Sequence, residues 1–488
     1  MSLHQRFTHG VFWSLIGTVA GRLFALAVSV VTARLLGKVG FGELGMLQST
    51  IGLMGTLAGF GLGITTTKYV AELKEKDPER TGRIIALSNL TAIVSGGLMA
   101  LVCVAGAPWL AQKTLNAPHL VPELRIGAAL LFVSALLVVQ TGSLSGFQSF
   151  RTIARINFFQ GLFSLPLALI LIYFWGLRGA VLYLIASALV GIVLSSRALS
   201  QEYAAAGLKA GLRGAWTERR ILWNFSFPAV ISGSMVTPIT WAANAILVNQ
   251  PNGYAELGLF NAANQFRMIV ILIPNVLAIV TVPLLSEIYS QKDREYFARA
   301  TNLNLRTIWS FALPCGFIVI ALSSWLMELF GPQFQGGRLV LSLMVCVTIM
   351  IVTDSTVGQT LISSGKMWTG FLLNLGWALI LLPSAAYLVP SMGAVGLALS
   401  YFISYSFLTF GMLIYTAAKF GRQGVQYSPL LSLLTGLIFI LSIATGRIPE
   451  SIFISLALIF AVITGIIAWE IIDLHNKNKI KEIIKSLF

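Results

Sequence analysis

The sequence is short of charged residues and of the residue types that most often carry catalysis. Charged residues make up 10% of its 488 positions, whereas soluble domains carry about 25%, and hydrophobic residues make up 56%. This balance excludes a soluble globular protein and leaves little chain for soluble domains. It indicates an integral membrane protein that crosses the bilayer many times.

Few residues are suited to enzyme chemistry. The three cysteines, Cys103, Cys315 and Cys346, fall inside apolar segments at spacings that suggest neither a disulfide framework nor a metal cage. The histidines and aspartates are isolated, and the longest predicted loop is about 20 residues and basic. A membrane-bound polymerase, ligase or phosphatase needs acidic clusters or metal-binding carboxylates, so we expect no enzyme activity, no cofactor and no metal site.

What is abundant is apolar sequence of membrane-spanning length. A span needs about 20 mostly apolar residues, and hydropathy breaks predict about fourteen spans, the first of them, 11–36, retained rather than cleaved. Loops on the N-terminal side carry about 24 of the 33 lysines and arginines, and the opposite loops about 7. This bias predicts cytoplasmic termini. It also attributes the net charge of +15 to topology and lipid headgroups rather than to nucleic-acid binding.

An internal repeat divides the predicted spans into two halves. Residues 40–46, GFGELGM, recur as residues 253–259, GYAELGL, and the GAV of 179–181 recurs at 393–395, which gives offsets of 213 and 214. Each half has six spans, an even number, so both enter the membrane in the same orientation. The predicted fold is an all-α integral membrane protein with two six-helix lobes related by a pseudo-twofold axis along the membrane normal, plus two C-terminal helices.

The same breaks predict the organisation of the chain. The C-terminal tail places apolar residues on one helical face and lysines on the other, so we expect it to lie along the cytoplasmic membrane surface. The predicted parts are an N-terminal lobe at 1–199, a basic cytoplasmic linker at 200–221, a C-terminal lobe at 222–418, helices 13 and 14 at 419–476, and the tail at 477–488.

Arg22 lies in the middle of the first predicted span, where a charged side chain costs ~2.5 to 3.5 kcal/mol on insertion scales. Ser14, Thr18, Ser29 and Thr32 fall on its helical face at spacings of three or four. A polar stripe on an apolar helix indicates a hydrated cavity. The alternative is an arginine satisfied by carbonyl groups in a packed interface.

Arg267 occupies the eighth predicted span, with Asn264 and Asn275 roughly on its side of the helix, and the same argument makes it a cavity candidate. In the seventh span, Thr237 and Asn244 lie on a stripe of small and polar residues. That stripe is compatible with a cavity wall and equally with close helix packing.

Asp354 is the acidic residue deep in a predicted span, the tenth. It is a candidate for carrying a coupling proton or cation, and the alternative is an ion pair or a carbonyl contact near the cytoplasmic end of that span. The repeat offsets pair Asp354 with Gln140 and Arg22 with Met235, so the charged groups come from non-equivalent positions.

Residues 32–37, TARLLG, followed by FGEL at 41–44 and preceded by FWS at 12–14, resemble the polysaccharide-biosynthesis flippases of the multidrug/oligosaccharidyl-lipid/polysaccharide exporter superfamily. The nearest likeness is to the O-antigen (Wzx-type) flippases. The resemblance implies two lobes forming a V around a central cavity and an undecaprenyl-pyrophosphate-linked oligosaccharide as substrate. In the related lipid II flippases cavity arginines come from the first, second and eighth spans. Arg22 and Arg267 match the first and eighth, and the second span has no arginine.

Two cations suit a diphosphate, so our hypothesis is that Arg22 and Arg267 bind the carrier while the lobes rock to expose the cavity alternately to each side. The expected setting is the bacterial inner membrane. The expected partners are the lipid-linked oligosaccharide, membrane lipids and the polymerase and chain-length machinery of the same pathway, with the chain functional as a monomer. The alternatives are a multidrug or cation-coupled exporter of the same superfamily, which should present acidic cavity groups, and a lipid II flippase.

Overall fold

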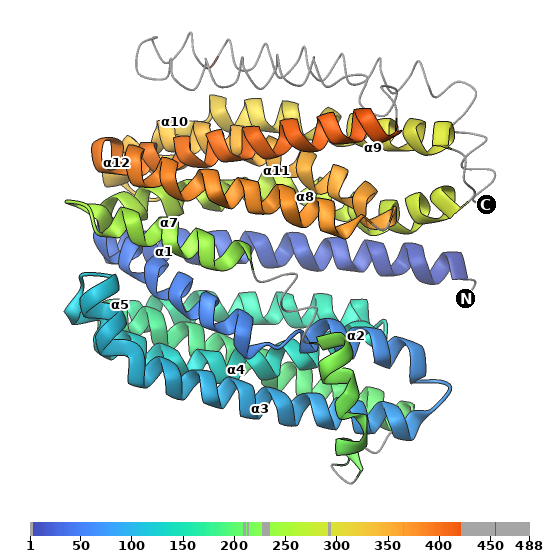
Figure 1. Ribbon diagram of the computed structural model, residues 1–488. Helices are drawn as coiled ribbons and strands as arrows, with labels where there is room; N and C mark the ends of the chain where they lie inside the picture. The colour runs from blue at the N-terminus through green and yellow to red at the C-terminus, as the bar shows by residue number, and fades with distance from the viewer. Residues whose placement is uncertain are drawn as a thin grey trace. The chain divides into compact units, whose positions relative to one another are not determined.

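The computed structural model describes residues 3–420, apart from 208–210, 212–213, 227–234, 291–293 and 365, together with Ile454. This part of the chain is helical and contains no strand (Figure 1). Seven of its helices are long and apolar enough to cross a membrane. Those seven fall in α1 (Leu3–Ala58), α3 (Pro78–Trp109), α4 (Val121–Gly146), α5 (Phe150–Ala205), α9 (Arg294–Ala321), α11 (Arg338–Ser363) and α12 (Met367–Phe420), and α8 (Gly253–Ser290) is a further long helix.

Shorter elements connect the long helices. They are α2 (Leu62–Leu73), η1 (Leu110–Thr114), η2 (Pro118–Leu120), η3 (Ala215–Arg219), η4 (Leu222–Ser226), α7 (Val236–Val248), α10 (Ser323–Glu328) and η5 (Pro332–Gly337). The chain divides into two compact units, residues 1–258 and 259–488. The first unit holds α1 to α7, and the second holds α9 to α12 and most of α8. Apart from Ile454, predicted spans 13 and 14 and the tail at 477–488 lie outside the described residues.

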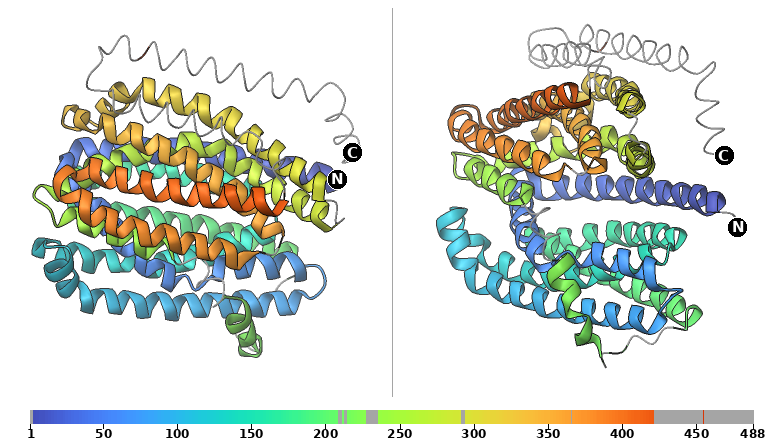
Figure 2. Two further views of the ribbon diagram at one scale, coloured as in Figure 1. Left: turned by 45° about the horizontal axis from the view of Figure 1, so that its top comes forward. Right: turned by 45° about the vertical axis from the view of Figure 1, so that its right-hand side comes forward.

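Helix α5 is a hairpin of two antiparallel arms, which correspond to the predicted spans 156–175 and 180–199. The chain reverses at Gly176, whose backbone (φ 54°, ψ −130°) is a conformation that essentially only glycine adopts. The arms are joined by a hydrogen bond between the Ser164 and Ser187 hydroxyl groups (2.6 Å) and by one that Gln160 Nε2 donates to the Ser187 carbonyl (3.0 Å). Figure 2 shows the arms side by side in both views.

Helix α12 is a hairpin of the same kind, and it corrects the predicted repeat. Its reversal at Gly393 has the same φ and ψ as Gly176, and a Cβ on Gly179 or on Gly396 would overlap the preceding arm in the same way. Gly176 is therefore equivalent to Gly393, an offset of 217. The predicted match of 179–181 with 393–395, at an offset of 214, was therefore wrong by three residues. An identity of three residues can arise by chance, whereas the two reversals share an unusual backbone conformation.

The second predicted span, 44–69, is interrupted. Helix α1 turns at Gly37 and ends at Ala58, and Phe60 and Gly61 then have positive φ values of 43° and 63° before α2 begins. Helix α2 continues the path and packs against α4 at Gly142, whose carbonyl accepts a 3.0 Å hydrogen bond from Thr67 Oγ1. Small residues permit this close approach of the two helices.

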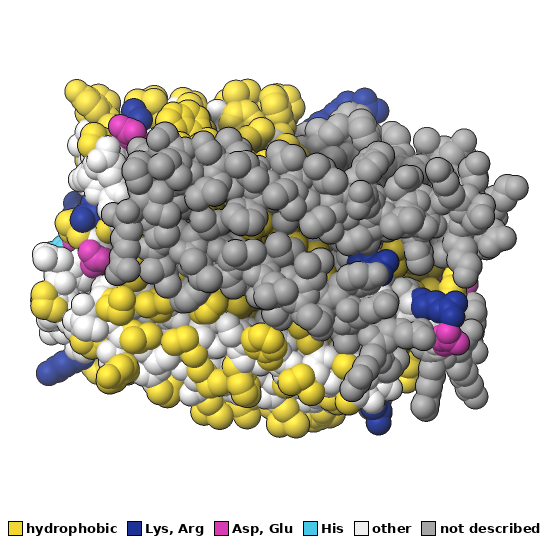
Figure 3. Space-filling view, turned by 90° about the horizontal axis from the view of Figure 1, so that it is seen from above, with side chains coloured by type: hydrophobic (Ala, Val, Ile, Leu, Met, Phe, Trp, Pro, Cys, Tyr) yellow, Lys and Arg dark blue, Asp and Glu magenta, His cyan; other side chains and the backbone are white. Residues whose placement is uncertain are grey.

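The surface of the described residues has the pattern of a protein embedded in lipid. Large hydrophobic side chains such as Leu101 and Phe174 are exposed along the helices. On the face in Figure 3, hydrophobic side chains lie between the helix ends and charged ones lie toward those ends. A continuous exposed apolar band is expected when the solvent is hydrocarbon.

Candidate functional site

Arg22 lies on the side of α1 that does not pack on α5. The packed side is defined by Gly17, which leaves no room for a Cβ against Ala154, and by Phe24, whose ring makes a T-shaped contact with Phe158 at 5.5 Å between centroids. Arg22 is exposed, and Ser29 is half-buried. The guanidinium group makes no ion pair with the described residues of its unit.

Thr32 does not share the exposed stripe. It is buried, its hydroxyl donates a 2.7 Å hydrogen bond to the Val28 carbonyl, and it faces Tyr183 of α5. Ten residues separate Arg22 from Thr32, and at 3.6 residues per turn they place Thr32 about 80° around the helix from Arg22, on the packed side. The side chains of Ser14 and Thr18 lie outside the described residues.

In the second unit, Arg267 of α8 is held by its own helix and by two tyrosines. Its Nη1 donates a 3.1 Å hydrogen bond to Asn264 Oδ1, as the shared face predicted, and it interacts electrostatically with Tyr401 and Tyr405 of α12. Its Nε is buried without a hydrogen-bond partner among the described residues. One donor of the guanidinium group is therefore unused. The side chain of Asn275 lies outside the described residues.

Asp354 of α11 lies at the other end of the same aromatic pair. It is 7% exposed, and both of its carboxylate oxygens lack a hydrogen-bond partner among the described residues. The Thr409 hydroxyl interacts with it without reaching hydrogen-bonding geometry, and Tyr405 interacts with it electrostatically. A buried carboxyl group without a counter-ion is costly, and such groups commonly have a functional reason.

The tyrosines link the two charged groups and were missed by the sequence reasoning. The rings of Tyr401 and Tyr405 are stacked 6.3 Å apart, Phe260 stacks on Tyr401 at 5.7 Å, and Trp377 contacts Tyr405 at 5.3 Å. A signal was present in the sequence, because Tyr401, Tyr405 and Thr409 are four residues apart and share one helical face. We call Arg267, Tyr401, Tyr405 and Asp354 the polar chain of the second unit.

The candidates of the seventh predicted span contribute to helix packing in the first unit. Asn244 Nδ2 of α7 donates a 3.4 Å hydrogen bond to Ser49 Oγ of α1, and Trp241 Nε1 donates one of 3.0 Å to Thr50 Oγ1. Thr237 is half-buried, and its carbonyl accepts a bond from a hydroxyl one turn later. Of the two readings of this stripe, the contacts of Asn244 favour packing.

Two glycines of the repeated motif meet in the first unit. A Cβ on Gly42 would overlap the carbonyl of Tyr254, and one on Gly258 would overlap the carbonyl of Lys38. The contact is reciprocal, as across a twofold axis, and pairs residues at an offset of 216. This again differs by three from the predicted register. At this offset Arg22 corresponds to Pro238 and not to Met235.

Polar groups surround this glycine contact. His119 Nε2 lies 2.7 Å from Glu43 Oε1, and the Tyr254 hydroxyl donates a 2.9 Å hydrogen bond to the Leu115 carbonyl. Burial, and to a smaller degree the nearby Glu43 carboxylate, raises the pKa of Tyr254 above its ordinary value. The phenol therefore remains a hydrogen-bond donor at all physiological pH values.

Solved structures with this arrangement are transporters. A multidrug resistance MATE family transporter of the MOP superfamily, in an inward-facing conformation, superposes with a TM-score of 0.70 at 14% identity over 83% of this chain and 98% of that one. The lipid II flippase MurJ, in an inward closed conformation, superposes with a TM-score of 0.67 at 14% identity over 94% and 98%. The chain therefore shares the fold of these two structures.

Sequence comparison gives the family. Residues 7–289 match the family described as polysaccharide biosynthesis protein, and the chain belongs to that family. The EPS I polysaccharide export inner membrane protein EpsE of Ralstonia solanacearum is 25% identical over 327 residues, 62% of this chain and 71% of that protein. EpsE of Ralstonia nicotianae is 24% identical over 397 residues, 78% and 87%.

Proposed function

We propose that this protein is an inner-membrane flippase that moves an undecaprenyl-pyrophosphate-linked oligosaccharide from the cytoplasmic to the outer leaflet by alternating access. Membership of the polysaccharide biosynthesis protein family carries the proposal, and the likeness to a polysaccharide export protein and to a lipid II flippase supports it. The substrate is translocated without a change in its covalent bonds. Both termini remain on the cytoplasmic side in this scheme, as the charge bias predicts.

Arg22 and Arg267 are the proposed ligands of the pyrophosphate. Arg22 is exposed on a membrane-spanning helix away from its packing partner, and Arg267 keeps a buried donor free. An arginine in the middle of the membrane is energetically costly and usually has an interaction partner or a function. Its planar guanidinium group can form two parallel hydrogen bonds with phosphate oxygens. The exposure of Arg22 and the unpaired donor of Arg267 are both expected of groups that bind an anionic substrate.

Asp354 is the proposed coupling site for a proton or a monovalent cation. Its unpaired carboxyl group interacts with Tyr405, which also interacts with Arg267. A positive charge entering at Asp354 therefore changes the electrostatic surroundings of Arg267 through one shared neighbour. This relay offers a physical route by which ion binding alters the affinity for the anionic carrier.

The test uses a strain deleted for this protein and complemented with variants. Arg22→Ala and Arg267→Ala should each reduce surface glycan at least tenfold and accumulate lipid-linked oligosaccharide on the cytoplasmic side, with the protein present in the membrane at normal levels. Arg155→Ala, an exposed arginine at the start of α5, is the matched control and should export normally. Normal glycan in both test variants contradicts the arginine mechanism.

The same strains separate the flippase from a multidrug exporter of this fold. Loss of the protein should leave resistance to cationic dyes unchanged while glycan export fails. The opposite pattern, dye sensitivity with normal glycan, would establish drug export as the activity. Accumulated lipid II in place of an oligosaccharide carrier would identify a lipid II flippase.

A further inference from the structure

The segment that connects α5 to α7 has an exposed face that the proposed transport cycle does not use. Its inner face, formed by Ala215, Ile221 and Ser226, is buried against the first unit. Ala215 packs against Ala86 and Leu87 of α3, and Leu222 packs in the same cluster. Ser226 Oγ lies 2.8 Å from Thr65 Oγ1 of α2, in a buried hydrogen bond. The segment is thus held at both ends.

An ion pair fixes the segment between these two ends. Arg80 Nε and Nη2 donate hydrogen bonds of 3.0 and 3.2 Å to the two carboxylate oxygens of Glu218, and Arg83 Nη2 lies 3.8 Å away. Glu218 is the acidic residue of residues 214–226, and these contacts neutralise it. The exposed side of the segment therefore carries a net positive charge.

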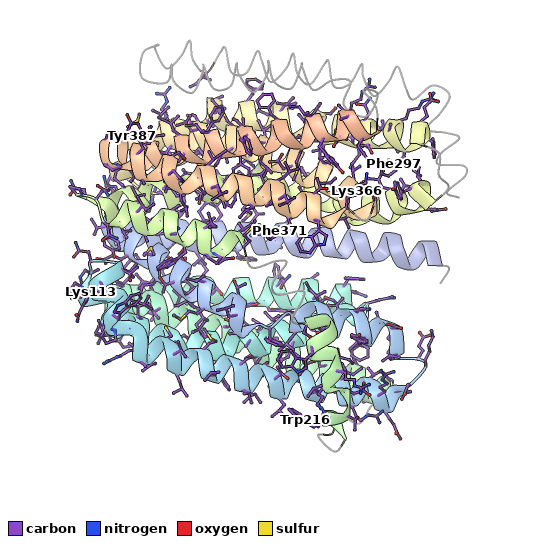
Figure 4. The ribbon with its side chains drawn as sticks, viewed as in Figure 1. Lys113, Trp216, Phe297, Lys366, Phe371 and Tyr387 are labelled. Atoms are coloured by element: carbon purple, nitrogen blue, oxygen red, sulfur yellow. The ribbon has the colours of Figure 1, made fainter. Side chains whose placement is uncertain are left out.

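The outer face carries Trp216, Arg219, Arg220 and Trp223. The two tryptophans are 62% and 65% exposed, and both arginines are exposed as well. Trp216 and Arg219 lie on the 3₁₀ helix η3, Arg220 follows it, and Trp223 lies on the π-helix η4, so the four exposed side chains belong to two consecutive turns. Figure 4 labels Trp216 at the edge of the first unit, beyond α3. We call this set the Trp–Arg face.

We propose that the Trp–Arg face binds the phosphate headgroups of anionic phospholipids in the cytoplasmic leaflet. Tryptophan favours the membrane–water interface, where its ring meets the acyl chains and its N–H meets polar headgroups. Arginine forms two-point hydrogen bonds with phosphate, and basic residues next to the cytoplasmic leaflet are attracted by its negative surface potential. The two arginines complement the negative charge of the phosphate, and the two tryptophans favour the level of the bilayer at which the headgroups lie.

The consequence is that the connection between the two halves of the repeat is anchored to the first unit and to the lipid surface together. This inference depends on the predicted cytoplasmic position of the segment and not on the identity of the transported molecule. A failure of glycan export assays would leave it standing, since lipid binding is measured on the purified protein.

Native mass spectrometry of the full-length protein in detergent, titrated with phosphatidylglycerol or with phosphatidylcholine of the same acyl chains, measures the binding. The unmodified protein should bind phosphatidylglycerol more tightly. The double variant Arg219→Gln/Arg220→Gln should lose about tenfold or more of that affinity. The matched double variant Arg155→Gln/Arg197→Gln removes the same charge from exposed arginines and should lose less than about twofold.

Hydrogen exchange of residues 215–226 verifies that both double variants keep the segment docked. Equal losses in the two double variants, no loss in either, or equal affinity of the unmodified protein for both lipids each overturns the proposal. As a second measurement, a fluorophore on Trp216→Cys in vesicles should be quenched by lipids brominated near the headgroup. Water-like emission without quenching overturns the proposal too.

Discussion

The guanidinium group of Arg80, at the start of α3, holds the carboxylate of Glu218 in the connecting segment by two hydrogen bonds of 3.0 and 3.2 Å. Two parallel bonds fix orientation as well as distance, which a single contact does not. The connection leaving α5 is therefore tied to the N-terminal end of α3. Its position is set by the first unit before the chain enters α7.

We predict that Glu218→Gln releases this segment locally. The amide keeps the shape of the side chain but loses the charge, and a partly exposed ion pair of good geometry contributes up to about 1 kcal/mol. Amide hydrogens of residues 215–226 should exchange up to about fivefold faster, with the rest of the chain unchanged. Glu79→Gln is the control, because Glu79 is 91% exposed and lies 3.9 Å from Arg83. A similar effect in both variants would argue against a specific role of the Arg80 pair.

The reciprocal glycine contact predicts a second pair of outcomes. Gly42→Ala or Gly258→Ala should destabilise the protein by about 1 to 3 kcal/mol, because the new methyl group overlaps a backbone carbonyl that cannot move aside easily. Gly52→Ala, in the same helix as Gly42 but with nothing near its Cβ position, should be neutral or stabilising by up to about 1 kcal/mol. The readout is the shift of the thermal unfolding midpoint in detergent. Equal shifts at positions 42 and 52 would falsify the contact.

The two hairpin reversals should respond alike. Gly176→Ala and Gly393→Ala each force a side chain into φ 54°, ψ −130°, at a cost of about 1 to 3 kcal/mol. No other atom crowds the Cβ position at Gly176, so backbone strain is the main cost there. Gly97→Ala, in α3 and with open space around it, controls for the general effect of the methyl group. Measured unfolding midpoints that fall at one reversal and not at the other contradict their equivalence.

Asp354 and Glu123 are buried carboxyl groups with opposite surroundings, and we predict opposite responses. Glu123 lies 3.6 Å from Arg178, whose side chain is 53% exposed, so Glu123→Gln removes a partly solvated ion pair and should lower stability by up to about 1 kcal/mol. Asp354→Asn removes an unpaired carboxyl group and should leave stability unchanged or raised, while reducing export at least tenfold. Glycan export and thermal unfolding are measured on both variants. Unchanged export with Asp354→Asn would remove this residue from the coupling scheme.

The class of fold could be predicted from composition alone, because apolar length is the strongest signal a membrane protein carries. The duplication was also visible, but its register was not. A glycine at positive φ and a glycine in an ordinary helix are the same letter, so the match of Gly179 with Gly393 took priority over the conformationally equivalent Gly176. The break at Phe60 and Gly61 could not be predicted for a different reason, because the sequence on both sides of it is apolar.

Contacts within one helix of the candidate site could be predicted from the sequence, but contacts between its helices could not. Arg267 and Asn264 are three residues apart, so helical periodicity predicts that they share a face, and the structure shows a hydrogen bond between them. Tyr401 and Tyr405 come from a helix more than a hundred residues later, and only tertiary packing brings them to Arg267 and Asp354. Side chains of one helix can be ordered by periodicity, whereas contacts between helices depend on a register that the sequence does not state.

The hairpin form of α5 and α12 has a consequence for biosynthesis. Each pair of arms is joined by a reversal of a few residues, so a nascent chain can place both arms in the bilayer as one unit without moving a polar loop across it. The reversal at Gly393 contains no charge, and that at Gly176 contains a single arginine, Arg178, for which Glu123 supplies a counter-ion. Insertion of these segments thus requires the translocation of at most one charged side chain per two spans.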